Sequence, residues 1–225
     1  MLLQLDRVSR RYGVRTALHP TDLAVDSGEC VALLGHNGSG KSTLLRIAAG
    51  RDTPNTGTAR FEGRPMDEND PVVRARVAVV GDTTAYYPDL TVREHLALVA
   101  VAHGVDDPLS WIDHILELQH LAEHGDALPA ALSSGQLQAM QLAAALVRPR
   151  DLLILDEPEQ RLDPSARHRL AELLRGELSD GVAVLFATHH PELALSVADR
   201  AVLLDEGAVL LSGDPQEVIP KAFLL

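Results

Sequence analysis

The stretch CVALLGHNGSGKST, residues 30–43, carries the strongest structural signal in this chain. It begins with five apolar residues, Cys30–Leu34, without the polar alternation of a half-exposed strand, and this predicts a strand buried on both faces. A glycine-rich loop follows, and residues 42–50 then have a helix-like composition. A buried strand, a glycine-rich turn and a helix in this order favour an α/β protein with a mostly parallel sheet.

The loop in this stretch, Gly35–Ser42, matches the pattern G-x-x-x-x-G-K-[ST] in full. Its glycines allow successive backbone N–H groups to curl around phosphate oxygens, and the next helix points its N-terminus at the same charge. Lys41 would then reach the β- and γ-phosphates, while the hydroxyl of Ser42 would bind Mg²⁺. A chance glycine turn is the competing explanation, but the position between a strand and a helix favours a phosphate site. The residues predicted to bind nucleotide here are Gly35, His36, Asn37, Gly38, Ser39, Gly40, Lys41, Ser42 and Thr43.

Two adjacent carboxylates follow another apolar strand, in the segment Leu152-Leu-Ile-Leu-Asp156-Glu157. An aspartate at the tip of such a strand can hold Mg²⁺ through water, and a glutamate beside it can orient or activate the attacking water. In isolation this pattern is common, and solvated surface acids would explain it better. Together with the phosphate-binding loop it predicts a nucleoside triphosphatase, in which Asp156 serves the metal and Glu157 serves catalysis.

The rest of the chain alternates between short apolar segments and helical ones, which supports a largely parallel sheet covered by helices on both sides. Residues 54–63 are expected to form a turn and a hairpin. The region between Gly81 and Arg150 is mostly helical in pattern and predicts an inserted helical lobe, in which Asp107-Pro108 is expected to start a helix. Strands are expected at residues 1–5, 16–25, 30–34, 77–80, 152–155 and 182–187.

The composition is that of an acidic globular protein. The 225 residues contain 20 Lys and Arg against 32 Asp and Glu, which gives a formal net charge of −12. Hydrophobic residues make up 46% of the chain, and this excludes a disordered chain. DNA affinity comes largely from clustered basic residues, and three Phe, three Tyr and one Trp are too few for base-stacking platforms. No direct nucleic-acid binding is therefore expected.

The cellular compartment is inferred from cysteine usage and from apolar runs. The single cysteine, Cys30, excludes an intramolecular disulfide and suggests a reducing environment. The longest strictly apolar run, residues 96–102, is far too short to span a bilayer as a helix, and charged residues from Asp6 onward come too early for a signal peptide. These features predict a soluble intracellular protein.

Three histidines, His114, His120 and His124, lie in the helical region, and the last two have the i, i+4 spacing of a metal-binding pair. No cysteine and no second layer of supporting residues accompanies them. A solvated helical face is therefore the better explanation.

Further motifs follow the phosphate-binding loop in a characteristic order. Leu132-Ser-Ser-Gly-Gln136 precedes Asp156-Glu157-Pro158, Leu162-Asp163 and Thr188-His189. In this order the chain resembles the nucleotide-binding domain of ATP-binding-cassette (ABC) proteins, from Leu5 to Val218. The resemblance implies an α/β fold: a P-loop NTPase core with a mostly parallel sheet, an N-terminal antiparallel β subdomain and an inserted α-helical subdomain. It also implies a single ABC nucleotide-binding domain over residues 1–225, with the helical subdomain at approximately 82–150.

The resemblance also implies roles for single residues. Tyr12 would stack on the adenine ring, although a turn tyrosine half buried by packing is the alternative. Asp156 would belong to the Mg²⁺ site, Glu157 would be the general base or orient the water, and His189 would contact the γ-phosphate. Asp163 would lie in a loop that communicates across a dimer. The signature residues, which would meet the γ-phosphate of an ATP held by the opposite subunit, are Ser133, Ser134, Gly135 and Gln136.

Three positions depart from the family pattern. Ser134 replaces the first glycine of a Leu-Ser-Gly-Gly-Gln signature and is small enough to fit near phosphate. Asp82 is the closest match to a glutamine that the family commonly places near the metal and the membrane partner; it could bind Mg²⁺, but it adds negative charge beside the triphosphate. Residues 159–161, Glu-Gln-Arg, replace a Thr-Ser-Gly-like stretch and are expected to put a charged pair at the subunit interface.

The function implied by the resemblance is an ATP-binding and ATP-hydrolysing subunit that energises a membrane transporter, with ATP and Mg²⁺ as cofactors. Its expected partners are a second nucleotide-binding domain, identical or different, and separate transmembrane permease subunits. The permease would hold the chain at the inner, cytoplasmic face of the cell membrane. The compact helical lobe and the absence of an added C-terminal regulatory domain favour an exporter over an importer. The alternatives are a soluble ABC ATPase acting on ribosomes, DNA or protein assembly, and a regulatory partner in which nucleotide binding matters and turnover does not.

Overall fold

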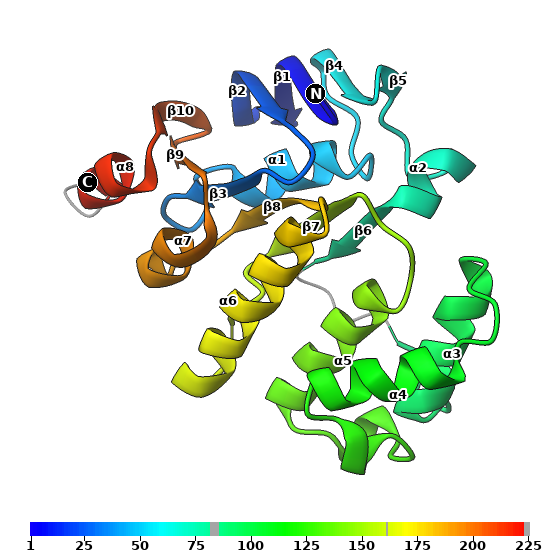
Figure 1. The fold of residues 1–225 in the computed structure, drawn as a ribbon. Helices are drawn as coiled ribbons and strands as arrows, with labels where there is room; N and C mark the ends of the chain where they lie inside the picture. Colours follow the sequence, from blue (N-terminus) through cyan, green and yellow to red (C-terminus); the bar gives the residue numbers. More distant parts are fainter. Residues whose placement is uncertain (82–85, 161, 223–225) are drawn as a thin grey trace.

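The computed structural model describes residues 1–81, 86–160 and 162–222, and the strands within them form two sheets (Figure 1). The larger sheet has the strand order β10-β9-β3-β8-β7-β6, and the smaller sheet has the order β2-β1-β4-β5. Asp82 and Arg161 lie outside the described residues. The predicted α/β fold, with an antiparallel N-terminal sheet, a mostly parallel sheet and a helical insertion, is confirmed.

The larger sheet is parallel except at one edge. β3 pairs in parallel with β8 and β9, and β7 lies between β8 and β6, while β10 pairs with β9 in the antiparallel sense. Every residue of β3 and β8 is buried, as their uninterrupted apolar sequences require. The strands of this sheet are β3 (Cys30–Leu34), β6 (Val77–Val80), β7 (Leu152–Asp156), β8 (Ala183–Ala187), β9 (Arg200–Asp205) and β10 (Ala208–Gly213).

The smaller sheet is antiparallel, with β1 paired to both β2 and β4. β1 is longer than the sequence predicts, because the three steps from Leu5 to Val8 face only two steps, from Leu23 to Thr21, in β2. Arg7 has a φ of +46° in this bulge, which breaks the apolar alternation while the pairing continues beyond it. The strands are β1 (Leu3–Tyr12), β2 (Arg15–Val25), β4 (Thr56–Phe61) and β5 (Arg64–Pro65).

Helices cover both faces of the larger sheet. α1 shares a hydrophobic core with Val31 and Leu33 of β3, whereas α6 and α7 share a second core with Ala32 and Leu34. Because neighbouring side chains of a strand point to opposite faces, the same strands serve both cores. No helix in the described part of the chain is long and apolar enough to cross a membrane. The helices outside the helical segment are α1 (Lys41–Ala48), α2 (Pro71–Arg76), α6 (Pro164–Ser179), α7 (Pro191–Val197) and α8 (Pro215–Ala222).

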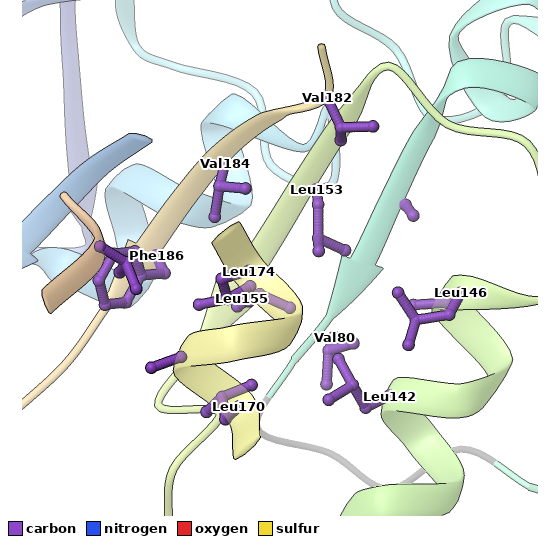
Figure 2. Close-up of a cluster of buried hydrophobic side chains, with 14 of the residues drawn as sticks. Val80, Leu142, Leu146, Leu153, Leu155, Leu170, Leu174, Val182, Val184 and Phe186 are labelled. Carbon is purple, nitrogen blue, oxygen red and sulfur yellow. The ribbon is translucent and has the colours of Figure 1, made fainter. Parts of the chain in front are cut away.

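Figure 2 shows the core on the α6 face of the larger sheet. Apolar side chains of β6, β7 and β8 meet side chains of α6, and α5 contributes further ones from the helical segment. This core therefore joins the sheet to the helical segment. The side chains labelled in the figure are Val80, Leu142, Leu146, Leu153, Leu155, Leu170, Leu174, Val182, Val184 and Phe186.

The segment between β6 and β7 is mostly helical and lies to one side of the larger sheet (Figure 1). A capping box starts α3: Thr91 accepts a hydrogen bond from the backbone N–H of Glu94, whose carboxylate accepts one from the N–H of Thr91. The expected start of α4 is wrong by one residue. Asp107 has a φ of +45° and does not cap, so that Pro108 is the N-cap residue and the helix begins at Leu109. The elements here are α3 (Val92–Ala102), α4 (Leu109–Leu118), the 3₁₀ helices η1 (Ala122–His124) and η2 (Pro129–Ala131), and α5 (Ser134–Leu146).

Truncation of a side chain in the core of Figure 2 tests this packing. Leu153 is 0% exposed, so Leu153→Ala should leave a cavity and lower the free energy of unfolding by about 2–5 kcal/mol. Leu195 on α7 is 49% exposed, and Leu195→Ala is the matched control, with an expected loss below about 1 kcal/mol. Urea unfolding followed by circular dichroism measures both, and equal losses would contradict the burial described here.

Candidate functional site

The glycine-rich loop joins the end of β3 to the start of α1. Gly35 and Gly40 have φ values of +142° and +106°, in the region that side chains disfavour. A Cβ on Gly35 would lie 2.1 Å from the carbonyl oxygen of Leu204, and one on Gly40 would lie 2.8 Å from that of Ala17. The loop can therefore pack this closely on β9 and β2 only with glycine at both positions. A tight loop of this kind points consecutive backbone N–H groups toward an anion.

Lys41, the first residue of α1, holds a positive charge over this loop. The residue is 4% exposed, and its ammonium group donates to the carbonyl oxygens of Gly35, at 2.8 Å, and His36, at 3.0 Å. Burial lowers the pKa of Lys41, and the carboxylates of Glu157 and Asp156 oppose this shift. The site therefore places a cation between the loop and two acidic residues, where a phosphate group and its counter-ion would lie.

A hollow of about 330 Å³ opens in front of the loop and is large enough for a small ligand. Besides Lys41, two further basic side chains line it, Arg15 from β2 and Arg46 from α1. Neither arginine belongs to a motif, and sequence reasoning did not single them out. Three cationic side chains around one hollow suit an anionic ligand such as a triphosphate.

Tyr12 ends β1 at the edge of this hollow and is 42% exposed. The guanidinium of Arg10 lies 4.8 Å from the centre of its ring, and its hydroxyl donates to Asp52. Arg10 and Asp52 also form an ion pair, at 2.6 Å between Nη2 and Oδ1. These contacts orient an aromatic ring that remains accessible, as stacking on a planar ligand requires.

The ends of β7 and β8 bring two predicted catalytic residues together. Asp156 pairs with Ala187 across the parallel strands, and the backbone N–H of Glu157 donates to the carbonyl of Ala187 at 3.0 Å. The carboxylate of Glu157 contacts Nε2 of His189, and Gln160 donates to its other oxygen at 3.3 Å. Glu157 also lines the hollow. The structure thus brings His189 into contact with Glu157, a residue that is distant in sequence and lines the hollow of the phosphate-binding loop.

Glu157 has a φ of +50°, an uncommon conformation for a residue with a side chain that costs of order 1 kcal/mol. This left-handed residue ends β7 at once and turns the carboxylate toward β8. The strained backbone of Glu157 lies where β7 and β8 end and where Glu157 contacts His189. Strain at such a position supports a functional role for the turn that begins at Glu157.

The oxygen donors beside the loop fit a Mg²⁺ ion that binds together with a nucleotide. Ser42 lines the hollow, and Asp156, the last residue of β7, lies close enough to Lys41 for its charge to oppose the lowering of the lysine's pKa by burial. Among the residues that the structure describes, no group of three or more His, Cys, Asp or Glu side chains is placed to hold a metal alone. Two protein oxygens, with the other positions left to phosphate and water, are what Mg²⁺ prefers. Asp82, the remaining predicted ligand, lies outside the described residues.

The signature residues lie at the start of α5 and do not line the hollow of the phosphate-binding loop. Ser133 is the N-cap residue: its hydroxyl accepts from the N–H of Gln136 at 3.3 Å, and Oε1 of Gln136 accepts from the N–H of Ser133 at 2.8 Å. This capping box explains the Ser-x-x-Gln spacing as a device that starts a helix. Asp163 likewise caps α6, by accepting from the N–H of Ala166 at 2.8 Å. One chain therefore keeps its signature apart from its own phosphate-binding loop.

The expectation that His120 and His124 share a solvated helical face is wrong. α4 ends at Leu118, His120 has a φ of +54°, and His124 lies in the short helix η1. His124 is half-buried, and its Nε2 lies 2.7 Å from the side-chain amide nitrogen of Gln136. This contact supports the signature residue from a separate segment. No sequence pattern reveals it, because it depends on how residues 119–133 fold back on α5.

The expectation that Glu159 contributes a charge to a subunit interface is also wrong. Glu159 is only 2% exposed, and its carboxylate accepts a hydrogen bond from the hydroxyl of Thr188 inside the chain. The sequence showed a charged residue in an otherwise small and polar turn, and such residues are usually solvated. The burial follows from partners supplied by the loop after β8.

The fold and the site define a P-loop nucleoside triphosphatase: a phosphate-binding loop follows the central parallel strand β3, and two carboxylates lie at the end of β7, which β8 separates from β3. The family model described as ABC transporter matches residues 18–160, which is more than half of the chain. The chain belongs to this family. It is an ATPase subunit of an ABC transporter, as the order of its motifs predicts.

Two similar proteins illustrate the range of this family. The Nod factor export ATP-binding protein I of Paraburkholderia xenovorans is 37% identical over 219 residues, which cover 96% of this chain and 72% of that protein. The sulfate/thiosulfate import ATP-binding protein CysA of Synechococcus elongatus is 39% identical over 220 residues, which cover 96% of this chain and 63% of that protein. The chain is thus similar to subunits named for export and for import.

Solved structures show the same fold. The ATP-binding subunit of an ABC transporter superposes with a TM-score of 0.90 at 30% identity, over all of this chain and 94% of that one. The cassette MJ0796, a dimer bound to ADP and phosphate, superposes with a TM-score of 0.87 over 95% of this chain and 98% of that one. At 24% identity, the second similarity shows the fold alone.

Substitution of a loop glycine tests the phosphate-binding geometry. Gly40→Ala should weaken ATP binding by about tenfold or more, because its Cβ would meet the carbonyl of Ala17 at 2.8 Å and displace the loop. Gly63 also has a positive φ, +78°, but a Cβ there would meet nothing within 4 Å. Gly63→Ala is therefore the matched control and should bind ATP as the parent chain does. Titration with a fluorescent ATP analogue measures both, and equal affinities would contradict the assigned loop.

Proposed function

We propose that this chain is a Mg²⁺-dependent ATPase subunit that forms complete ATP sites only with a second nucleotide-binding domain and that energises a separate membrane permease. One observation carries this proposal. The phosphate-binding loop and Glu157 line one hollow, and His189 contacts Glu157, whereas the signature at the start of α5 does not line this hollow. One chain therefore offers half of one site and the complementary half of another. In these terms residues 1–225 act as a single nucleotide-binding domain, with its helical subdomain at about 82–150.

The residues of the hollow have distinct roles in this proposal. Backbone N–H groups of the loop and the ammonium of Lys41 bind the β- and γ-phosphates. Tyr12 stacks on the adenine ring, because its ring is accessible and oriented by Arg10. Ser42 and Asp156 supply oxygens to Mg²⁺, which neutralises phosphate charge when it is bound there.

Hydrolysis depends on the pair formed by Glu157 and His189. The carboxylate of Glu157 orients the attacking water and accepts its proton, because it is the acidic group that lines the hollow at the end of β7. The contact with Nε2 of His189 holds this carboxylate in place. In this proposal His189 also contacts the γ-phosphate, as the family resemblance implies.

A second nucleotide-binding domain supplies the missing half of each site. The N-terminus of α5 carries the positive end of a helix dipole, and the exposed Ser133 and Ser134 add hydroxyl groups next to it. This end is suited to meet the γ-phosphate of an ATP bound by the partner. The solved MJ0796 structure is named as dimeric, and a pair of cassettes is accordingly part of this proposal.

The permease would bind the helical segment. Three apolar side chains near α3, Tyr87, Leu98 and Val101, are 59%, 43% and 65% exposed, and they offer a surface for a membrane partner. This contact would place the chain on the inner face of the cell membrane. Export is the proposed direction, in line with the two Nod factor export ATP-binding proteins that are 37% and 36% identical over 96% and 97% of this chain.

Replacement of the water-orienting carboxylate tests the catalytic assignment. Glu157→Gln should lower ATP turnover by about 10²-fold or more, because an amide cannot accept the proton, while ATP binding stays within about threefold. ATP-bound dimers should then accumulate in size-exclusion chromatography. The control Glu172→Gln changes an exposed carboxylate on α6 and should keep normal turnover. Undiminished hydrolysis by Glu157→Gln would remove this residue from the mechanism.

Gentle detergent extraction tests the partners. The tagged full chain, purified from native membranes, should retain a protein with several transmembrane segments together with a second nucleotide-binding domain. Tyr87→Glu and Val101→Glu should each reduce the recovered permease at least about tenfold without loss of ATP binding, because a buried unpaired charge opposes an apolar contact. Recovery of ribosomes or DNA in place of a permease would favour the soluble ABC alternative.

A further inference from the structure

Glu159 is a buried carboxylate that none of the roles above uses. It lies in the turn between β7 and α6 and is 2% exposed. It takes part in no ion pair within the described part of the chain. A carboxylate removed from water destabilises the fold by several kcal/mol unless hydrogen bonds compensate. Its position therefore needs a reason.

The side-chain hydrogen bonds of Glu159, within the residues that the structure describes, go to the loop that follows β8. Its Oε1 accepts from the hydroxyl of Thr188 and from the backbone N–H of His189, at 3.3 Å. The same hydroxyl accepts from the N–H of His190 at 2.9 Å, and the N–H of Thr188 donates to the carbonyl of Leu33 at 3.1 Å. One carboxylate oxygen thus holds the backbone of His189 directly and the N–H of His190 through the hydroxyl of Thr188.

Two carboxylates of one turn hold the same histidine. Glu157 contacts the ring of His189 at Nε2, and Glu159 accepts from the backbone N–H of that residue. Hydrogen bonds from the N–H of Gln160 to the carbonyl of Glu157, at 3.0 Å, and from Leu162 to Glu159, at 3.1 Å, shape the turn that spaces them. The backbone and the imidazole of His189 are therefore both held by residues of the turn that follows β7.

The second oxygen of Glu159 points to a functional reason for the residue. Oε2 is buried and has no hydrogen-bond partner among the residues that the structure describes. An unsatisfied buried oxygen costs stability, so the contacts of Oε1 alone do not explain the residue as a structural element. Buried polar groups that lower the stability of the fold in this way are typical of functional sites.

We propose that Glu159 is a positioning residue for ATP hydrolysis: it anchors the backbone of the loop at residues 188–190 so that the imidazole of His189 meets Glu157. It does not line the hollow of the phosphate-binding loop, and it acts through His189. The inference rests on the proposed catalytic roles of Glu157 and His189. The position of His189 depends on the hydrogen-bond acceptor Oε1 of Glu159 and does not require the negative charge of this residue.

Turnover of the full chain, assembled with the partners it is purified with, tests this proposal. Glu159→Ala should lower kcat for ATP about 10–100-fold, with KM and ATP affinity within about threefold, because most of the groups assigned to ATP binding lie in the phosphate-binding loop and β1. Glu159→Gln keeps an acceptor at Oε1 and should restore kcat to within about fivefold of the parent. The control Glu172→Ala removes an exposed carboxylate of α6 and should change neither value.

A double-mutant cycle separates positioning from general loss of structure. In a His189→Ala background, Glu159→Ala should change the remaining turnover less than about twofold, because both changes remove one function. NMR spectra of histidine-labelled protein add a direct readout: the ring signal of His189, assigned from the His189→Ala spectrum, should move in Glu159→Ala and stay in Glu159→Gln. Where Glu159→Ala does not fold, Thr188→Val removes the hydroxyl donor and should reproduce the loss of kcat, with Thr188→Ser restoring it.

Several outcomes would overturn the proposal. Parent-like kcat in Glu159→Ala, an equal loss in the His189→Ala background, or an unmoved ring signal would each show that Glu159 does not act through His189. A loss in Glu159→Gln as large as that in Glu159→Ala would assign the effect to charge. If Glu157→Gln and His189→Ala themselves hydrolyse ATP normally, the proposed catalytic mechanism fails instead.

Discussion

The parallel pairing of β3, β8 and β7 is the constraint on which the rest of the site depends. Ala187 of β8 stands opposite Leu33 on one side and opposite Asp156 on the other. The three strands therefore end at one level, and the segments that leave them are neighbours. The phosphate-binding loop leaves β3, Glu157 leaves β7, and His189 leaves β8. The chemistry assigned to the hollow depends on this register, because the register brings the segments that carry the functional side chains together.

Strand burial explains how this register is held. β3 and β8 are buried along their full length, and their alternating side chains enter two cores, one under α1 and one under α6. A slip of one residue would exchange the two sets of side chains between cores of different shape. The polar residues lie just beyond the strand ends, where backbone groups are no longer required for the sheet. The turn at Glu157 and the anchor at Glu159 occupy this position.

Much of the fold could be predicted because its signals are local. Continuous apolar runs marked β3 and β6 with the bounds that the structure shows. The errors arose where a long-range contact overrides a local pattern. β1 continues past a bulge because it is paired on both sides, and α4 starts late because Asp107 adopts a left-handed conformation. The sequence pattern places Glu159 at a subunit interface and His124 on a solvated helical face, and in the structure both are held by partners from other segments of the chain.

The sequence by itself determined the phosphate-binding loop, the carboxylate pair at the end of β7, the signature at the start of α5 and the class of protein. Each of these depends on neighbouring residues, whose spacing follows directly from backbone geometry. Only the tertiary structure decided which side chains meet: Glu157 with His189, Glu159 with Thr188, and Arg10 with Tyr12 and Asp52. The reason is that strand order and register set these distances, and no single strand carries the information about its neighbours.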